Sequence, residues 1–91
     1  MDVLITFKVS KDERAVRDAM RKLGYYSNWK ESEKSYELPD SCVWKPDTGL
    51  VKAKSDLLKI TTEMTDRDTT FKLISSIIVY ADPWTGVPKE D

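Results

Sequence analysis

Apolar and polar residues alternate at the start of the chain. Every second residue from Val3 to Val9 is apolar, and the residues between them are polar except for Leu4. This period of two is typical of a β-strand that buries one face. The pattern therefore predicts a first strand with Ile5 and Phe7 pointing into a core.

Helical spacing follows this strand. Four apolar residues recur at i, i+3, i+4 and i+7 and form one stripe. They are Val16, Ala19, Met20 and Leu23. Ser10 and Glu13 have the spacing of a capping box, and Gly24 can adopt the left-handed conformation that often ends a helix. We expect a helix whose stripe packs against the first strand.

Residues 25–38 are expected to form a short hairpin. Trp29 on one arm and Tyr36 and Leu38 on the other would line one face, with the turn near Ser32-Glu33. Neither turn residue readily adopts the positive φ that the tightest hairpin turns require. Proline-aspartate pairs bracket the next segment, so it is expected to be a loop. This loop, residues 39–47, contains Cys42, Val43 and Trp44.

A second amphipathic helix is expected after this loop, capped by Asp47 or Thr48. Its apolar stripe consists of Leu50, Ala53, Leu57, Ile60 and Met64. Two i, i+4 ion pairs are expected on its outer side, Lys52–Asp56 and Lys59–Glu63. The polar segment over residues 65–69 is expected to end the helix.

The last apolar segment, residues 71–81, is rich in β-branched residues and predicts a final strand that ends at a turn over residues 82–86. The order strand, helix, strand, strand, helix, strand predicts an α+β fold of the ferredoxin-like βαββαβ type. Such a fold has a four-stranded antiparallel sheet with two helices on one face. We expect a single domain over residues 1–86 and a frayed tail over residues 87–91.

Composition narrows the class of protein. The chain has 91 residues, of which 40% are hydrophobic and 34% charged, so it has room for one core beneath a charged surface. Its single cysteine, Cys42, excludes an internal disulfide and fits a reducing compartment. No apolar run approaches the roughly 20 residues of a membrane span, and Met1 precedes a strand pattern. We expect a cytoplasmic protein that does not enter the membrane.

Several kinds of chemistry lack the residues they need. The chain has no histidine, which excludes Ser-His-Asp triads and imidazole zinc sites. Cys42 has no neighbour in sequence that would activate it, so a packed thiol is expected. Asp66 and Asp68 flank Arg67 and could hold Mg²⁺, although turn and cap roles explain them more simply. We therefore expect no catalytic residue, no cofactor and no metal site.

Basic residues recur on one face of the first helix. The candidate nucleic-acid contacts are Lys11, Arg14, Arg17 and Arg21. Because acidic residues are interleaved, we favour a solvated face joined by intrahelical pairs. These pairs are Glu13–Arg17, Arg14–Asp18 and Asp18–Lys22. With a net charge of −1, the whole molecule provides no field that would attract nucleic acid.

The chain is rich in aromatic residues for its size. The aromatic residues include Tyr25, Tyr26, Trp29, Tyr36, Trp44 and Trp84. A ribonucleoprotein-type sheet would stack bases on such side chains, but its glycine-aromatic signature is missing. Packing within the core or an interface is therefore the favoured role.

The final strand predicts a homodimer. It is apolar on both faces, whereas only one face of a two-layer fold meets the helices. The uncovered set would form a contact with a second copy of the chain. The candidate interface residues are Leu4, Ile78, Tyr80 and Trp84.

Three segments carry a resemblance to a known family. They are the strand V-L-I-T-F-K-V with S-K-D-E-R and a helix closing at L-G-Y, the hairpin W-K-E-S-E-K-S-Y-E-L-P, and the strand I-I-V-Y-A. The chain resembles the small CRISPR-associated ferredoxin-like proteins and their relatives in toxin–antitoxin and mobile-element settings. The resemblance implies a homodimer and, in some members, metal-dependent cleavage of nucleic acid by an aspartate that ends the first strand. Lys8 stands at that position here and would repel Mg²⁺.

These observations predict a non-catalytic dimeric binding or adaptor protein in a defence, toxin–antitoxin or phage-related setting, with a protein partner favoured over nucleic acid. One alternative is a metal-dependent endonuclease that acts on RNA or DNA through other carboxylates. The other is a regulatory dimer that binds a small molecule between its subunits, an analogy with the fold alone.

Overall fold

The structure is a computed structural model of the chain and describes residues 1–31, 33–81 and 84–88. Five strands and two helices occur in these residues. In chain order they are β1 (Val3–Val9), α1 (Glu13–Lys22), β2 (Asn28–Glu31), β3 (Lys34–Glu37), β4 (Cys42–Lys45), α2 (Leu50–Arg67) and β5 (Leu73–Tyr80). The mixed α+β composition with two helices is confirmed.

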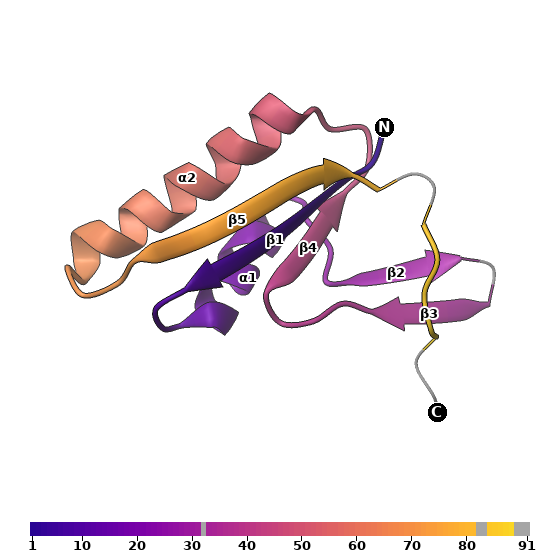
Figure 1. Cartoon of the computed structure of the whole chain (residues 1–91), viewed down its shortest axis with the longest axis horizontal. Coiled ribbons are helices and arrows are strands. Elements are labelled where there is room, and N and C mark those ends of the chain that lie inside the picture. The colour runs from indigo at the N-terminus through magenta and orange to yellow at the C-terminus, as the bar shows by residue number, and fades with distance from the viewer. Residues whose placement is uncertain (32, 82–83, 89–91) are drawn as a thin grey trace.

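The strands form two antiparallel sheets instead of the single four-stranded sheet that was predicted. One sheet has the order β4-β1-β5, and the other is the β2-β3 hairpin, which lies beyond β4 (Figure 1). A bridge between Tyr26 and Trp44 joins them. The amide of Tyr26 donates to the carbonyl of Trp44 at 2.8 Å, and the amide of Trp44 donates to the carbonyl of Tyr26 at 3.0 Å.

The predicted loop over residues 39–47 was wrong because it contains β4. This strand is only four residues long, and its first two residues, Cys42 and Val43, are both buried, so it shows no alternation of apolar and polar residues. The predicted hairpin is confirmed, with Trp29 paired with Tyr36. Ser32, in its expected turn, lies outside the described residues.

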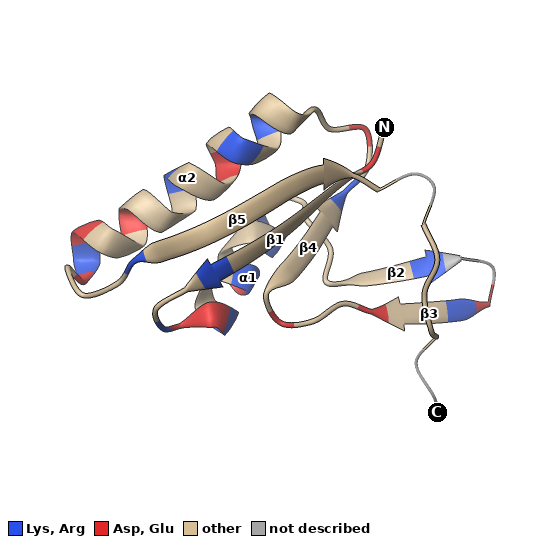
Figure 2. Ribbon diagram, viewed as in Figure 1, with Lys and Arg blue, Asp and Glu red and all other residues tan. Residues whose placement is uncertain are grey.

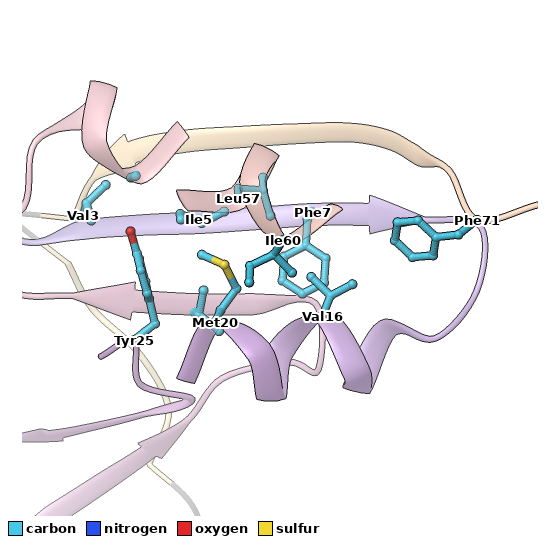
Figure 3. Packing of buried hydrophobic residues seen from close by; sticks show 11 residues of the cluster. Val3, Ile5, Phe7, Val16, Met20, Tyr25, Leu57, Ile60 and Phe71 are labelled. Atoms are coloured by element: carbon cyan, nitrogen blue, oxygen red, sulfur yellow. The ribbon is translucent and has the colours of Figure 1, made fainter. Parts of the chain in front are cut away.

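The core lies between the three-stranded sheet and the helices. Val3, Ile5 and Phe7 of β1 are buried, as the alternating pattern predicted. Figure 3 shows them facing side chains of both helices, among them Met20 of α1 and Leu57 of α2. Both helices therefore cover the same face of β1, and the predicted stripes are largely confirmed. Leu50 is the exception, since 38% of its surface is exposed.

The helix ends differ from the sequence prediction. Asp12, in a left-handed conformation with φ of 58°, precedes α1 and makes no side-chain cap hydrogen bond. The predicted capping box does not form, because the Ser10 hydroxyl instead contacts the backbone of Thr70 and Lys72, just before β5. Gly49, not Asp47 or Thr48, is the N-cap of α2, and this helix continues through Arg67 into the segment expected to end it. Gly24 has the expected positive φ, 95°.

The register of β5 against β1 decides which residues are uncovered. Ile78 pairs with the buried Ile5, whereas Val79 pairs with Leu4. Residues paired across an antiparallel ladder share a face, so Ile78 lies on the core face, where it packs against the buried cluster.

Beyond β5, Ala81 donates its amide to the carbonyl of Asp2 at 2.9 Å. Residues 82–83 of the expected turn and residues 89–91 of the expected tail lie outside the described residues. Trp84 packs on the hairpin, and Val87 is exposed. Neither described helix combines the length and apolar character needed to cross a membrane.

Candidate functional site

The outer face of β1 and β5, away from the helices, carries uncovered apolar side chains. Ile77 is 64% exposed and Val79 is 42% exposed, and they pair with Thr6 and Leu4 of β1. The predicted interface set therefore needs a correction of phase. Leu4 lies on this face, but its neighbours there are Ile77 and Val79. Ile78 and Tyr80 pair with residues of the core face of β1 and so lie on the opposite face.

Strand β5 also forms an edge of its sheet. It pairs only with β1 among the described strands, so the backbone groups on its other side have no partner strand there. All eight residues of β5 are uncharged, and its ribbon is tan along its whole length in Figure 2. Natural edge strands usually carry a charge, a proline or a bulge that blocks pairing. Along β5 the register shift at Lys8/Val9 lies at the start of the strand.

The β4 side of the sheet is covered by aromatic rings. The ring of Trp44 stacks on that of Trp29 with centroids 4.0 Å apart, and its indole N–H donates to the carbonyl of Asn28 at 2.6 Å. The ring of Trp84 lies 4.9 Å from those of both Trp29 and Tyr36. Trp84 is thus part of this cluster, where the sequence had placed it beside the final strand.

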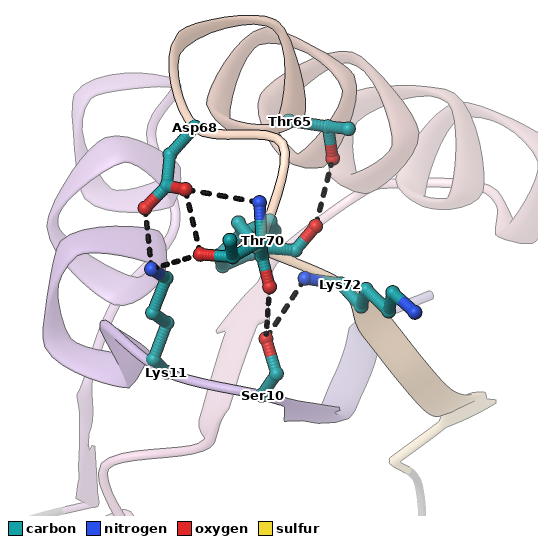
Figure 4. Close-up of polar contacts among 7 residues, drawn as sticks. Ser10, Lys11, Thr65, Asp68, Thr70 and Lys72 are labelled. Carbon is teal, nitrogen blue, oxygen red and sulfur yellow. Dashed lines mark hydrogen bonds and ion pairs between the residues drawn. The ribbon is translucent and has the colours of Figure 1, made fainter.

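Lys11, the first candidate nucleic-acid contact, is part of a polar network between two loops (Figure 4). Its ammonium lies 2.5 Å from a carboxylate oxygen of Asp68 and donates to the Thr70 hydroxyl. The Ser10 hydroxyl accepts from the amide of Lys72 at 2.9 Å in the same network. The hydrogen bond from Lys11, together with those from Thr70, lowers the pKa of Asp68 to about 2. Lys11 therefore joins the β1–α1 loop to the loop before β5.

Arg14 and Arg17 are also neutralised. Both contact the carboxylate of Asp40, at 3.3 Å and 2.7 Å respectively. The predicted intrahelical pairs are replaced by this contact with the segment before β4, and Arg17 also lies 3.7 Å from Asp18. Arg21 differs from them, since it is exposed and makes no ion pair with any described residue.

Two buried polar side chains, Tyr25 and Asp56, are hydrogen-bonded to each other. The Tyr25 hydroxyl donates to Asp56 at 2.8 Å, and Lys52 donates to the other oxygen of that carboxylate at 2.8 Å. Burial, followed by the hydrogen bond to Asp56, raises the pKa of Tyr25. Burial opposes ionisation of Asp56, but the hydrogen bonds from Lys52 and Tyr25 outweigh it and lower the pKa of the carboxyl. The predicted Lys52–Asp56 pair is confirmed, although Asp56 is buried instead of lying on the outer side of α2.

The structure also places the residues considered for catalysis. Cys42 is buried, and burial raises the pKa of its thiol to about 11, as expected of a packed thiol. Lys8 is exposed on β1 opposite Ser75. Among residues 1–31, 33–81 and 84–88, no three cysteine, aspartate or glutamate side chains gather closely enough to hold a metal ion.

Sequence reasoning missed two surfaces. It did not single out Ile77 and Val79, because a strand apolar on both faces gives no phase. It also did not single out Tyr26 and Lys30 as neighbours of Trp44, because β4 was not expected. In both cases the missing information is strand pairing.

Comparisons with known proteins leave the chain without an identified family. No protein-family model matches it, and neither a curated protein nor a solved structure does. The resemblance to CRISPR-associated ferredoxin-like proteins stays a prediction.

Proposed function

We propose that this chain is a non-catalytic binding module that works as a homodimer, paired through the free edge of β5. The observation that carries this proposal is the combination of an edge that no described strand pairs with, an uncharged strand, and exposed Ile77 and Val79 beside that edge. An exposed, long and apolar edge strand is a template for pairing with another chain. Contiguous apolar side chains on the neighbouring face mark the same surface as an interface.

A second copy of the chain is the occupant that fits this edge. Two β5 strands related by a two-fold axis would pair antiparallel, which would extend each three-stranded sheet into a continuous sheet of six strands. The nearest charge in sequence is Lys72, just before the strand. In a pair centred on the middle of β5 the two copies of Lys72 would lie about 30 Å apart, at a rise of roughly 3.4 Å per residue, so they would not repel one another.

The proposal also covers the fold type. A ferredoxin-like sheet places its first strand between its third and last strands, and its second strand beside the third. The order β4-β1-β5 has this arrangement, and the Tyr26–Trp44 bridge lies where the remaining strand would pair. We interpret the chain as a ferredoxin-like domain whose second strand is reduced to one bridge before it enters the hairpin.

Two observations support a non-catalytic role. The sequence has no histidine. The thiol of Cys42 is buried, with its pKa raised to about 11, so little thiolate forms near neutral pH. The defence, toxin–antitoxin or phage-related setting stays a prediction that rests on the resemblance alone.

Light scattering at micromolar protein concentration tests the dimer. The wild-type chain should have twice the 10.5 kDa chain mass. Ile77→Lys should return it to the monomer, because it places two charges in the paired region without touching the core. Val51→Lys is the matched control, since Val51 is also an exposed apolar residue but lies on α2. A wild-type monomer at high micromolar concentration, or a dimer that survives Ile77→Lys, would contradict the proposal.

A further inference from the structure

A basic aromatic surface surrounds Tyr26, at the side of the sheet opposite β5. We call it the Tyr26 patch, and it consists of Arg21, Lys22, Tyr26, Lys30 and Trp44. The side chain of Tyr26 is 50% exposed. Its ring centroid lies 5.3 Å from that of Trp44, and the two planes are tilted by 34°. The backbone bridge between these residues holds Tyr26 beside Trp44 of β4.

Tyr26 separates two open hollows. The first has a volume of about 500 Å³ and is lined by Arg21, Lys22 and Tyr25, together with Asp18. The second has a volume of about 330 Å³ and is lined by Asn28, Lys30 and Trp44. Tyr26 belongs to the lining of both. The ring of Tyr26 is therefore open to solvent, with Arg21 and Lys22 in one hollow and Lys30 in the other.

The cations of the Tyr26 patch differ from the rest of the basic helix face. Lys11, Arg14 and Arg17 have carboxylate partners. Arg21, Lys22 and Lys30 form no ion pair within the described part of the chain. The one acid in the first hollow, Asp18, lies 3.7 Å from Arg17. The Tyr26 patch thus has three cations available for an anionic ligand.

We propose that the Tyr26 patch binds single-stranded nucleic acid. A base would stack on the ring of Tyr26, and backbone phosphates would contact Arg21, Lys22 and Lys30. Proteins that bind single strands without sequence preference combine exposed aromatic rings with cations along the backbone path. The patch has both features, and it lies away from the β5 edge, so this inference does not depend on the proposed dimer.

The chemistry of the patch favours this ligand over two others. A duplex keeps its base faces inside the stack, so it would contact the cations but leave Tyr26 unused. A proline-rich peptide docks on aromatic rings but carries no charge that the three cations would complement. A single strand offers flat bases and negative charges together, and so uses every member of the patch.

Fluorescence anisotropy with labelled oligo(U) and oligo(dT) of about ten nucleotides tests the proposal. Both should bind, and log affinity should fall against log salt with a slope of about −2, the value for three neutralised phosphates on a single strand. Tyr26→Leu should weaken binding by about tenfold through lost stacking, and Tyr26→Phe should retain it. Arg21→Ala with Lys30→Ala should weaken binding and reduce the slope. Measuring the unfolding midpoint of each variant separates these losses from unfolding.

Lys11→Ala with Arg14→Ala is the matched control, because these two cations already contact Asp68 and Asp40, which line neither hollow, and their loss should leave binding unchanged. Repeating the titration with Ile77→Lys separates this proposal from the dimer, since that variant should bind with the same dependence on Tyr26. Absence of binding at low salt would overturn the proposal. Binding that Tyr26→Leu leaves intact, that loss of the two control cations abolishes, or that a duplex or a neutral proline-rich peptide matches would overturn it too.

Discussion

At the β4 edge of the three-stranded sheet, Tyr26 adds a backbone bridge and the rings of Trp29 and Trp44 stack over the outer face. At the β5 edge, no described strand pairs with the backbone, and Ile77 and Val79 are exposed on that same face. Both edge strands, β4 and β5, pair with β1, and all three strands contribute residues to the same core. Within the described residues, the chain thus covers one edge of the sheet and leaves the other without a paired strand.

The difference between the edges lies in the local connections. The segment between α1 and β4 contains 19 residues, 23 to 41, and its hairpin brings aromatic side chains back onto β4. After β5, the described residues 84–88 lead to the hairpin and not along β5 (Figure 1). Covering an edge requires a segment that can return to it. The free edge is therefore the one to which pairing with another chain is assigned.

Truncation of one side chain at each edge tests this comparison directly. Trp44→Ala should lower the free energy of unfolding by about 3 kcal/mol, the lower end for Trp→Ala, because Trp44 is partly exposed. Val79→Ala should cost less than about 1 kcal/mol, as expected of an exposed side chain. Urea unfolding of both variants in the Ile77→Lys background would measure these costs for a single copy. Equal costs would mean that the two edges are equally integrated into the fold.

The Tyr25 hydroxyl joins the segment before the hairpin to Asp56 of α2, so it should contribute to stability on the β4 side of the sheet and not on the β5 side. Tyr25→Phe removes the hydrogen bond to Asp56 and should cost about 1.5–3 kcal/mol, the range for hydrogen bonds to charged groups. Ser75→Ala on the exposed face of β5 is the matched removal of a hydroxyl and should be close to neutral. Chemical denaturation measures both.

The same pair of residues sets a pH dependence. The pKa of Asp56 is lowered in the folded protein, so its stabilising effect is complete above its unfolded pKa, near 3.9, and is lost as the pH falls through the folded pKa. Tyr25→Phe removes one of the hydrogen bonds that lower this pKa. The carboxyl of Asp56, followed by NMR, should then titrate at a higher pH. An unchanged titration would show that Lys52 alone holds the carboxylate.

Local patterns predicted the parts of the fold that depend on local order. Strand β1 and the stripe of α1 follow from periods of two and 3.6, because each has one buried face. Strand β4 was missed because the adjacent residues Cys42 and Val43, which lie on opposite faces of the strand, are both buried, and this removes the alternation. Ile78 was placed on the wrong face because both phases of β5 are apolar, and only pairing with β1 distinguishes them.

The candidate surfaces were less predictable than the core because they depend on which charges meet in space. Arg14 and Arg17 are paired with Asp40, 26 and 23 residues away, where the sequence offered nearer acids within the helix. The interleaved acids correctly predicted that these two arginines have carboxylate partners, but the partner is Asp40 and not an acid within the helix. That reasoning could not distinguish these two arginines from Arg21. Arg21 lines the same hollow as Tyr26, and it is the bridge to Trp44 that places Tyr26 next to β4.

Thiol reactivity compares solvent access at the two edges. Cys42 lies on β4 and is buried, and burial raises the pKa of its thiol to about 11, so both access and thiolate formation are restricted. A cysteine introduced by Ser75→Cys in a Cys42→Ala chain would lie on the exposed face of β5. At pH 8 it should have the ordinary thiol pKa, near 8.5, and react quickly with a disulfide reagent. The wild-type thiol should react at least about a hundredfold more slowly, since its thiolate fraction alone is lower by more than two orders of magnitude at a pKa near 11. In urea the two thiols should react at the same rate. A fast reaction of Cys42 in the folded protein would mean that β4 is as accessible as β5, and the contrast between the two edges would then be lost.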